Sequence, residues 1–350
     1  MNDTINDTSM RAIVISAART ASLTRIPRWL PDAGQIVVRC RAAGVCTTER
    51  QLYAGRRDNY PAVGGHEVAG VVEEVNEPSL GLRPGDRVTL DAVRRCGQCL
   101  PCQTGNDHRC DDMSVSRRYG GFARIGGGFA EYTVIPAKQA IKIPDDLSFE
   151  EAALAEPLAC CLHSIRKAVI EPGQRVCILG AGFMGLLHLK LVQHAGARAF
   201  VTDLNEARLA FAKRLGADEA FNVKDADPVQ AVRSWTNGLG ADAVFVTAGD
   251  ATAASAALNM VGRGGRIVFF ASVHPSVFIP ADWNRIHYDE VIITGSASKT
   301  AREFRDAVGL LADRAITVHE LIGRVISLEA LPAELDGPLP KLGQRVVVRH

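Results

Sequence analysis

The sequence lacks three features that would assign it to whole classes of protein. No apolar run among its 350 residues is long enough to span a bilayer, so no transmembrane segment is predicted. Its 40 Lys and Arg residues are balanced by 39 Asp and Glu residues, so it has no basic excess typical of a nucleic-acid-binding surface. The first ten residues have neither the basic nor the apolar region of a signal peptide. We therefore expect a cytoplasmic protein that binds neither nucleic acid nor membrane.

The remaining composition is that of an ordinary globular protein. Apolar residues make up 47% of the chain and charged residues 23%, which is enough material for hydrophobic cores. At roughly 150 residues per domain, the length predicts two domains. Nine cysteines are present, and four of them fall between positions 96 and 110. Because disulfides do not persist in a reducing compartment, this density indicates metal binding or catalysis.

The pattern of apolar residues changes near position 150. Before it, short β-branched runs are separated by Gly, Pro and Asp, which predicts a largely β unit from residue 11 onward. After it, continuous apolar runs such as 175–179 and 243–247 alternate with helical stretches such as 206–215. This alternation is typical of a parallel sheet buried on both faces, and it predicts a doubly wound α/β domain.

The last part of the chain resembles the first part. A final strand of the parallel sheet is expected at 291–294, followed by a helix at about 300–313 and by β-like runs at 323–327 and 345–349. We therefore predict an α/β protein with a β-rich domain of residues 11–155, to which residues 298–350 return. The doubly wound domain comprises residues 156–297.

A dinucleotide-binding motif lies between the first expected strand and helix of the second domain. Gly180, Gly182 and Gly185 form the pattern G-x-G-x-x-G, with Met184 inside it. The first glycine permits a tight turn, the second lets a pyrophosphate approach the backbone, and the third lets the helix pack close to the strand. We predict that these four residues bind a dinucleotide; the alternative is a packing turn without a ligand.

The acidic residue that this motif requires is also present. Asp203 ends the next expected strand about 20 residues further on, where its carboxylate can accept hydrogen bonds from the adenosine ribose and repel a 2′-phosphate. No cation follows it directly. Arg208, one helical turn on, could contact the adenosine, or it could lie on a solvated helix face. The predicted cofactor is therefore NAD and not NADP.

The four clustered cysteines suit a tetrahedral zinc ion. They are Cys96, Cys99, Cys102 and Cys110. A closed set of four thiolates leaves no open position, so the predicted role is structural. An iron–sulfur cluster is the alternative, but the ferredoxin pattern places its last cysteine three residues on and follows it with proline; here seven residues intervene and Asp111 follows. His108, within the loop, is interpreted as a solvated residue.

Three further residues could form a second metal site. Cys46, His66 and Glu156 lie in the local sequences Gly-Val-Cys-Thr-Thr-Glu, Gly-Gly-His-Glu-Val-Ala-Gly and Ala-Glu-Pro-Leu. Singly, each is more often a buried hydrophobe or a structural residue. Together they offer three ligands and an open fourth position, as in a catalytic zinc site.

The order of these motifs resembles the zinc-dependent medium-chain alcohol dehydrogenase family. The Glu-Pro-Leu version at the third ligand is similar to the polyol (sorbitol) and threonine dehydrogenase branches. The resemblance implies that Cys46, His66 and Glu156 bind a catalytic zinc, with Glu67 approaching or replacing a ligand; which carboxylate is the resting ligand stays open. It also implies that Thr48 passes on the proton of an alcohol substrate.

The resemblance further implies a GroES-like catalytic domain, a Rossmann coenzyme domain, two zinc ions per chain and a homodimer or homotetramer. The strand near 291–294 is the expected pairing edge. Three positions depart from the family pattern. Thr47 replaces a common glycine, Gln51 replaces a relay histidine, and Ser298, beside Lys299, stands where sorbitol enzymes carry an arginine.

The predicted function is therefore zinc- and NAD-dependent oxidation of a secondary hydroxyl group on a polyol, sugar or cyclitol. A threonine-type amino-alcohol dehydrogenase is the alternative within the same branch. A zinc-free quinone or enoyl reductase lacks the metal ligands seen here. A non-catalytic dinucleotide-binding protein would not need Cys46, His66, Glu156 and Thr48 together.

Overall fold

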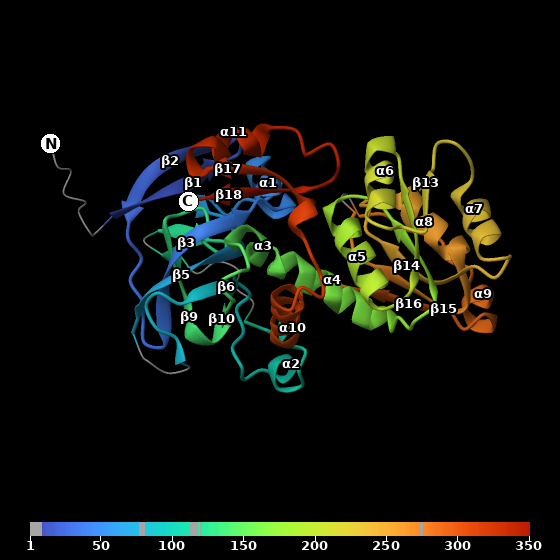
Figure 1. Ribbon diagram of the computed structural model, residues 1–350, viewed down its shortest axis with the longest axis horizontal. Helices are drawn as coiled ribbons and strands as arrows, with labels where there is room; N and C mark the ends of the chain where they lie inside the picture. The colour runs from blue at the N-terminus through green and yellow to red at the C-terminus, as the bar shows by residue number, and fades with distance from the viewer. Residues whose placement is uncertain (1–8, 77–80, 113–117, 120, 274–275) are drawn as a thin grey trace. The chain divides into compact units, whose positions relative to one another are not determined.

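The computed structural model describes residues 9–76, 81–112, 118–119, 121–273 and 276–350, and it contains two compact units (Figure 1). Unit 1 comprises residues 1–156, 300–340 and 345–350, and unit 2 comprises residues 157–299 and 341–344. The two-domain α/β architecture is as predicted. The boundaries fall one or two residues from the expected ones. Residues 341–344, which the sequence analysis assigned to the first domain, group with unit 2.

Unit 1 is built from two sheets. One has the strand order β2-β1-β4-β8-β7, and the other has the order β10-β6-β5-β3-β18-β17, with β9 also paired to β3. The strands are β1 (Ser9–Ala17), β2 (Thr20–Pro27), β3 (Gln35–Gly44), β4 (Ala62–Val63), β5 (Glu67–Val75), β6 (Arg87–Asp91), β7 (Arg118–Tyr119), β8 (Phe122–Arg124), β9 (Tyr132–Pro136), β10 (Ala140–Lys142), β17 (Ile322–Ser327) and β18 (Arg345–Arg349). Since β18 pairs with β3, the end of the chain completes the second sheet.

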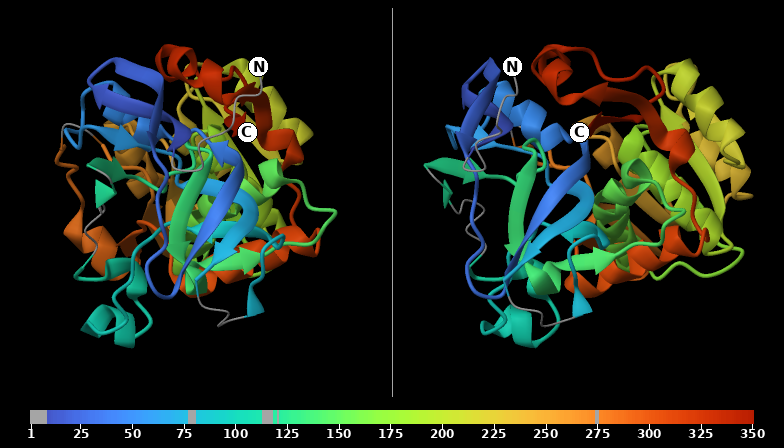
Figure 2. Two further views of the ribbon diagram at one scale, coloured as in Figure 1. Left: turned by 90° about the vertical axis from the view of Figure 1, so that its left-hand side faces the viewer. Right: turned by 60° about the vertical axis from the view of Figure 1, so that its left-hand side comes forward.

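Apart from α10 (Ala301–Ala312), which has 12 residues, the helices of unit 1 are short. The short helices are α1 (Thr47–Tyr53), α2 (Leu100–Gln103), α3 (Phe149–Ala153) and α11 (Leu331–Asp336), with 3-10 turns at Asp107–Arg109 (η2), Ala137–Gln139, His319–Leu321 and Leu328–Ala330. The loop that carries α2 projects from the rest of unit 1 (Figures 1 and 2).

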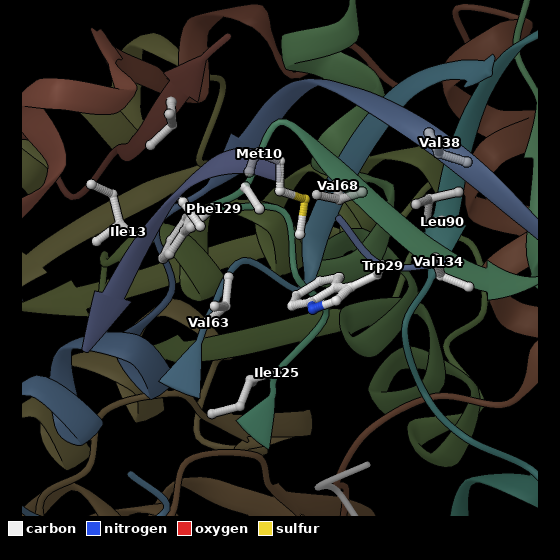
Figure 3. Close-up of a cluster of buried hydrophobic side chains, with 14 of the residues drawn as sticks. Met10, Ile13, Trp29, Val38, Val63, Val68, Leu90, Ile125, Phe129 and Val134 are labelled. Atoms are coloured by element: carbon white, nitrogen blue, oxygen red, sulfur yellow. The ribbon is translucent and has the colours of Figure 1, made fainter. Parts of the chain in front are cut away.

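One hydrophobic cluster fills the interior of unit 1. Met10, Ile13, Trp29, Val68 and Phe129 belong to it, and all are less than 4% exposed (Figure 3). These side chains come from strands and loops far apart in sequence, and burying each one contributes on the order of 1.5–3 kcal/mol. The cluster supports β5 and the loop before it, and His66 and Glu67 lie at this junction.

Unit 2 holds one parallel sheet of six strands in the order β13-β12-β11-β14-β15-β16. This is the 3-2-1-4-5-6 order of a dinucleotide-binding fold. The strands are β11 (Arg175–Leu179), β12 (Arg198–Asp203), β13 (Glu219–Asn222), β14 (Ala241–Val246), β15 (Val261–Phe269) and β16 (Ile292–Gly295). The helices are α4 (Ala155–Ala168), which begins at the end of unit 1, and α5 (Phe183–His194), α6 (Glu206–Arg214), α7 (Pro228–Trp235), α8 (Ala251–Met260) and α9 (Trp283–Tyr288).

Short polar side chains start most of the helices of unit 2. Asn205, Asp227, Asp250 and Asp282 each accept a backbone N–H from the first turn of the following helix. Each cap satisfies a donor that would otherwise be unpaired and contributes about 1 kcal/mol. Helix α5 has no such side chain because its cap residue is Gly182. In the parts of the chain that the structure describes, no helix is both long and apolar enough to cross a membrane.

His188 is a fully buried titratable residue of unit 2. Its ring lies 4.9 Å from the ring of Phe245 and 4.8 Å from that of Phe270, and its Nδ1 contacts the carbonyl oxygen of Met184 at 2.7 Å. Burial lowers the pKa of His188 to about 4. The folded protein therefore keeps this imidazole neutral, whereas the unfolded chain takes up a proton below about pH 6.5.

We expect His188 to make unit 2 less stable in mild acid. The free energy of unfolding is unaffected by this residue's ionisation above pH 6.5. As the pH falls toward 4, protonation of His188 in the unfolded chain lowers the free energy of unfolding by about 3 kcal/mol in total. Thermal unfolding between pH 6.5 and 4.5 should therefore show a smaller decrease in midpoint for His188→Leu than for the wild type. Equal pH dependence of the two proteins would contradict this assignment.

Candidate active site and coenzyme site

The candidate active site is a group of metal-ligand atoms around His66 in unit 1. One ligand atom each from Cys46, Glu49 and His66 lies within 4.8 Å of the others, and the same holds for His66, Glu67 and Glu156. Cys46 is the cap residue of α1, His66 precedes β5, Glu67 begins β5, and Glu156 lies in the first turn of α4. His66 is common to both groups, whereas Cys46 belongs to the first and Glu156 to the second.

Glu49 fixes the orientation of His66, and the sequence analysis gave this residue no role. Its Oε1 lies 2.7 Å from Nδ1 of His66 and accepts the backbone N–H of Gly65 at 3.0 Å. Its Oε2 accepts the backbone N–H of Cys46 at 3.2 Å. With Nδ1 held in this way, Nε2 of His66 is the nitrogen left for a metal ion, and such a carboxylate partner raises the basicity of the imidazole. Glu49 is therefore a positioning residue.

Glu67 is completely buried and is paired with Arg345. Its Oε1 lies 2.8 Å from Nη2 of Arg345, the first residue of β18. Among the described residues, no group donates a hydrogen bond of good geometry to either oxygen of Glu67. A buried carboxylate with free lone pairs is costly unless a cation is present. The guanidinium supplies one positive charge, and the free lone pairs could bind a metal ion.

Two glycines make room for these carboxylates. A Cβ atom at Gly44 would overlap the carboxylate of Glu67, and a Cβ atom at Gly64 would lie 2.7 Å from Cγ of Glu49. Gly65 has a left-handed backbone with φ of +88°, a conformation that favours glycine. Gly44 and Gly64 are therefore explained by packing around the acidic side chains, and Gly65 by its backbone conformation.

The site favours positive charge. Burial opposes ionisation of His66, but Glu49 and Cys46 outweigh it and raise the pKa of His66 well above its ordinary value. Burial would raise the pKa of Glu49, yet His66 and the N–H of Gly65 bring it below its ordinary value. Burial does raise the pKa of Glu67, although Arg345 opposes the effect. A site with this surplus of acidic groups binds a cation favourably.

Helix α1 carries two polar residues that the sequence analysis singled out, Thr48 and Gln51. The hydroxyl oxygen of Thr48 is 3.9 Å from Sγ of Cys46, so it lies beside an expected ligand. Gln51 lies one turn further along α1 and is partly exposed. Neither of its side-chain groups titrates.

The four clustered cysteines form a second group in the projecting loop. Their sulfur atoms all lie within 4.8 Å of one another, and Sγ of Cys96 is 4.0 Å from Sγ of Cys102. Tetrahedral zinc with bonds of about 2.3 Å requires sulfur atoms about 3.8 Å apart. Backbone N–H groups of Gln98 and Cys99 donate to Sγ of Cys96 and lower the pKa of this thiol to about 6. Burial raises the pKa of the Cys102 thiol to about 12, so it is the clustering of the four sulfur atoms that suits a metal ion.

Buried charges attach this loop to the rest of unit 1. Arg95 contacts Asp107 at 3.0 Å and Asp91 at 2.5 Å, and Asp107 accepts the backbone N–H of Ala301 at the start of α10. His108 is only 5% exposed, so the expectation of a solvated residue was wrong. The 3-10 turn of residues Asp107–Arg109 turns its ring inward, and residue spacing alone does not show this.

The glycine motif forms a tight turn between β11 and α5 in unit 2. Gly180 has φ of +112°, and a Cβ atom at Gly185 would overlap the carbonyl oxygen of Gly180. The first and third glycines are therefore required by the turn itself. By contrast, apart from the neighbouring residues of its own chain segment, no atom of the described residues lies within 4 Å of the Cβ position of Gly182, the cap residue of α5. This open space at a helix N-terminus fits a pyrophosphate group. Met184 lies in the first turn of α5.

Asp203 stands beside the glycine turn. Its Oδ2 accepts the backbone N–H of Ala181 at 2.8 Å, and its Oδ1 accepts those of Leu204 and Asn205 at 2.8 and 2.9 Å. The guanidinium of Arg208 lies 3.9 Å from Oδ2 and is partly exposed. Asp203 therefore shapes the turn, and the guanidinium of Arg208 lies close enough to partly neutralise its charge.

Comparisons with known proteins agree with this geometry. Residues 32–145 match the family described as Alcohol dehydrogenase GroES-like domain, and residues 184–313 match the family described as Zinc-binding dehydrogenase. The chain is 30% identical over 329 residues to sorbitol dehydrogenase of Bacillus subtilis, covering 92% of this chain and 91% of that protein. It is 32% identical over 264 residues to L-threonine 3-dehydrogenase of Bacillus velezensis, covering 73% and 75%.

Solved structures lead to the same family. A protein of Sinorhizobium meliloti 1021, described as a zinc-binding dehydrogenase and bound to NADP, superimposes with a TM-score of 0.91 at 30% identity, covering 98% of this chain and 100% of that one. The chain belongs to the zinc-binding alcohol dehydrogenase family of oxidoreductases. The resemblance inferred from its motifs is confirmed.

Proposed function

We propose that this chain is an NAD-dependent dehydrogenase with a catalytic zinc ion, and that it oxidises a secondary hydroxyl group of a polyol, sugar or cyclitol. The observation that carries the proposal is the buried donor set around His66. In it, the carboxylate of Glu67 accepts no well-formed hydrogen bond from the described residues. The kinship with a sorbitol dehydrogenase supports the substrate class.

The donor set fits zinc in its chemistry. Cys46 offers a thiolate, His66 a nitrogen whose tautomer Glu49 fixes, and Glu156 or Glu67 a carboxylate. Thiolate, imidazole and carboxylate are the ligands of catalytic zinc sites, in which a fourth position stays open. The cysteine loop, with four sulfur atoms and no other ligand, would hold a second, structural zinc ion. We therefore propose two zinc ions per chain.

Each residue of the site would have its own role in alcohol oxidation. When bound, zinc provides a Lewis acid for the hydroxyl oxygen, and NAD provides the hydride acceptor. The Thr48 hydroxyl, beside Cys46, accepts the substrate proton and passes its own proton toward solvent. Gln51 cannot take up that proton, so water must receive it. Glu49 holds the ring of His66, and Arg345 balances the charge of Glu67.

Coenzyme preference should depend on the charge of Asp203. Asp203→Asn keeps one acceptor oxygen but removes the charge that repels a 2′-phosphate, and Arg208 nearby could then attract that phosphate. We expect the preference for NAD over NADP, measured as the ratio of kcat/KM values, to fall by about 10- to 100-fold. An unchanged ratio, or a wild-type enzyme that prefers NADP, would contradict the role of Asp203.

A substrate panel distinguishes the proposed function from its main alternative. L-threonine 3-dehydrogenases are relatives of similar identity, so an amino alcohol is the second candidate substrate. Formation of NADH should be measured with polyols, sugars, cyclitols and L-threonine. A higher kcat/KM for a polyol, sugar or cyclitol supports the proposal. The highest value for L-threonine would replace the proposed substrate class but leave the zinc and NAD assignments unchanged.

We propose that a second copy of the chain covers the outer edge of the parallel sheet. Strand β16 is the last strand in the sheet order, and its Ile292 and Ile293 are 43% and 39% exposed. Trp283 and Tyr288 on α9 are also exposed. An apolar strand edge is suited to pairing with a symmetry mate. Light scattering should therefore show a dimer or tetramer, and Ile293→Lys should weaken it. A monomeric wild type would contradict this proposal.

A further inference from the structure

Arg50 connects the helix of the candidate metal site to the C-terminal part of unit 1. It lies on α1, which begins directly after Cys46 and carries Thr48. Its Nη1 donates to the carbonyl oxygen of Gly337 at 2.8 Å and contacts that of Leu335 at 3.4 Å, while its Nη2 pairs with Glu334. The Arg50 side chain is 13% exposed. A guanidinium held by three acceptors at the end of α11 fixes α1 to that helix.

The chain that leaves α11 leads to the glycine turn. Residues 341–344 belong to unit 2, and Gly343 there has φ of +74°. A Cβ atom at Gly343 would lie 2.7 Å from the carbonyl oxygen of Ala181 and 3.0 Å from Cα of Gly182. Gly343 therefore packs against the backbone of the turn that is proposed to bind the pyrophosphate. Only five residues lie between it and Gly337, which Arg50 holds.

The downstream end of this segment is fixed by contacts of Arg345 with residues of the candidate metal site and next to it. Two residues after Gly343, Arg345 pairs with Glu67 at 2.8 Å, and its Nη1 contacts the carbonyl oxygen of Val45 at 3.3 Å. Val45 directly precedes Cys46. We name residues 338–344 the strap. The strap begins directly after Gly337, which Arg50 contacts, and ends directly before Arg345, which contacts Glu67. Within the strap, Gly343 contacts the glycine turn.

We infer that Arg50 is a positioning residue which, through the strap, couples coenzyme binding at the glycine turn to the helix that carries Cys46 and Thr48. The inference rests on the proposed function, because it takes the glycine turn as the coenzyme site. Arg50 fixes the upstream end of the strap, so Gly343 is kept against the turn and the turn is preorganised for the coenzyme. Loss of Arg50 loosens this end, and coenzyme binding must then order it more fully.

Arg324 provides a matched control for this role. Its Nη2 also pairs with Glu334, at 2.9 Å, and it contacts the carbonyl oxygen of Pro338 at 3.3 Å. However, it comes from β17 and not from the metal-site helix. If Arg50 only stabilised the fold, Arg50→Leu and Arg324→Leu should both lower the unfolding temperature without changing the affinity for the coenzyme.

The test measures the Kd for NADH by fluorescence titration of the zinc-loaded proteins, together with zinc content and unfolding temperature. Arg50→Leu should bind NADH about 5- to 20-fold more weakly than the wild type, with unchanged zinc content. Arg50→Lys, which can still donate to one of the three acceptors, should recover part of the affinity and remains informative if Arg50→Leu does not fold. Arg324→Leu leaves the contacts of Arg50 with Leu335 and Gly337 in place, so it should weaken binding by no more than about twofold.

A second pair of variants tests the other end of the coupling. Gly343→Ala should weaken NADH binding because its Cβ would press on the glycine turn. Gly238→Ala introduces similar left-handed strain, with φ of +84° and no atom of the described residues within 4 Å, and should not weaken binding. Wild-type affinity in both Arg50 variants, or equal weakening in Arg324→Leu, overturns the inference. A wild type that binds no NADH overturns the proposed function instead.

Discussion

Cys46→Ser should lower the rate of alcohol oxidation by at least about a thousandfold while the protein stays folded and still binds NADH. Serine is a poor ligand for zinc because its hydroxyl stays protonated at neutral pH, so the catalytic ion would be lost or misplaced. The glycine turn lies in unit 2 and does not contain Cys46, so coenzyme binding should persist. Steady-state kinetics, zinc analysis and an NADH titration together measure this result.

Cys160→Ser is the matched control for this experiment. Cys160 is partly exposed on α4 and belongs to neither group of candidate metal ligands. It should retain two zinc ions and near-wild-type kinetics. If Cys46→Ser kept a tenth or more of the activity, the assignment of Cys46 as a ligand of the catalytic metal would be wrong.

Cys99→Ser should have its largest effect on stability. Four sulfur atoms within 4.8 Å of one another leave a poorly packed, charged loop when the ion is absent, and a structural zinc site contributes directly to the free energy of folding. Arg95 and Asp107 tie this loop to α10, so its loss also loosens that contact. We expect the unfolding temperature to fall by at least about 10 °C and soluble yield to fall with it.

The two cysteine variants control for each other. Cys46→Ser should lose activity with a small change in unfolding temperature, whereas Cys99→Ser should lose stability and retain residual activity in the fraction that remains folded. A Cys99→Ser protein with wild-type stability and two zinc ions would contradict a structural metal in the loop. The same stability loss in both variants would mean that the two sites are not separate in function.

Features carried by short stretches of sequence were predictable. The spacing of the four cysteines is enough to place their sulfur atoms together, because one loop supplies them all. The glycine motif and Asp203 follow from the strand–turn–helix pattern, in which parallel neighbouring strands end at the same edge. Apolar periodicity was enough to predict the alternating strands and helices of unit 2 and the return of β17 and β18 to unit 1.

Features that depend on distant contacts were not predictable. Arg345 is 278 positions from Glu67 in sequence, and only the pairing of β18 with β3 brings the two together. Glu49 could have been suspected from its place three residues after the cap of α1, where a side chain can reach back to the cap N–H. Nothing in the sequence indicated that residues 341–344 leave unit 1 to pack against the glycine turn.

Metal removal followed by titration with zinc tests the central claim most directly. The enzyme should be treated with a chelator until activity is lost, and NADH formation with the best substrate of the panel should then be measured as zinc is added. We predict that activity rises as zinc is added and reaches its maximum when two zinc ions are bound per chain, one of which is the catalytic ion. Cys46→Ser should show no recovery. Full activity with less than one zinc ion per chain would contradict the account.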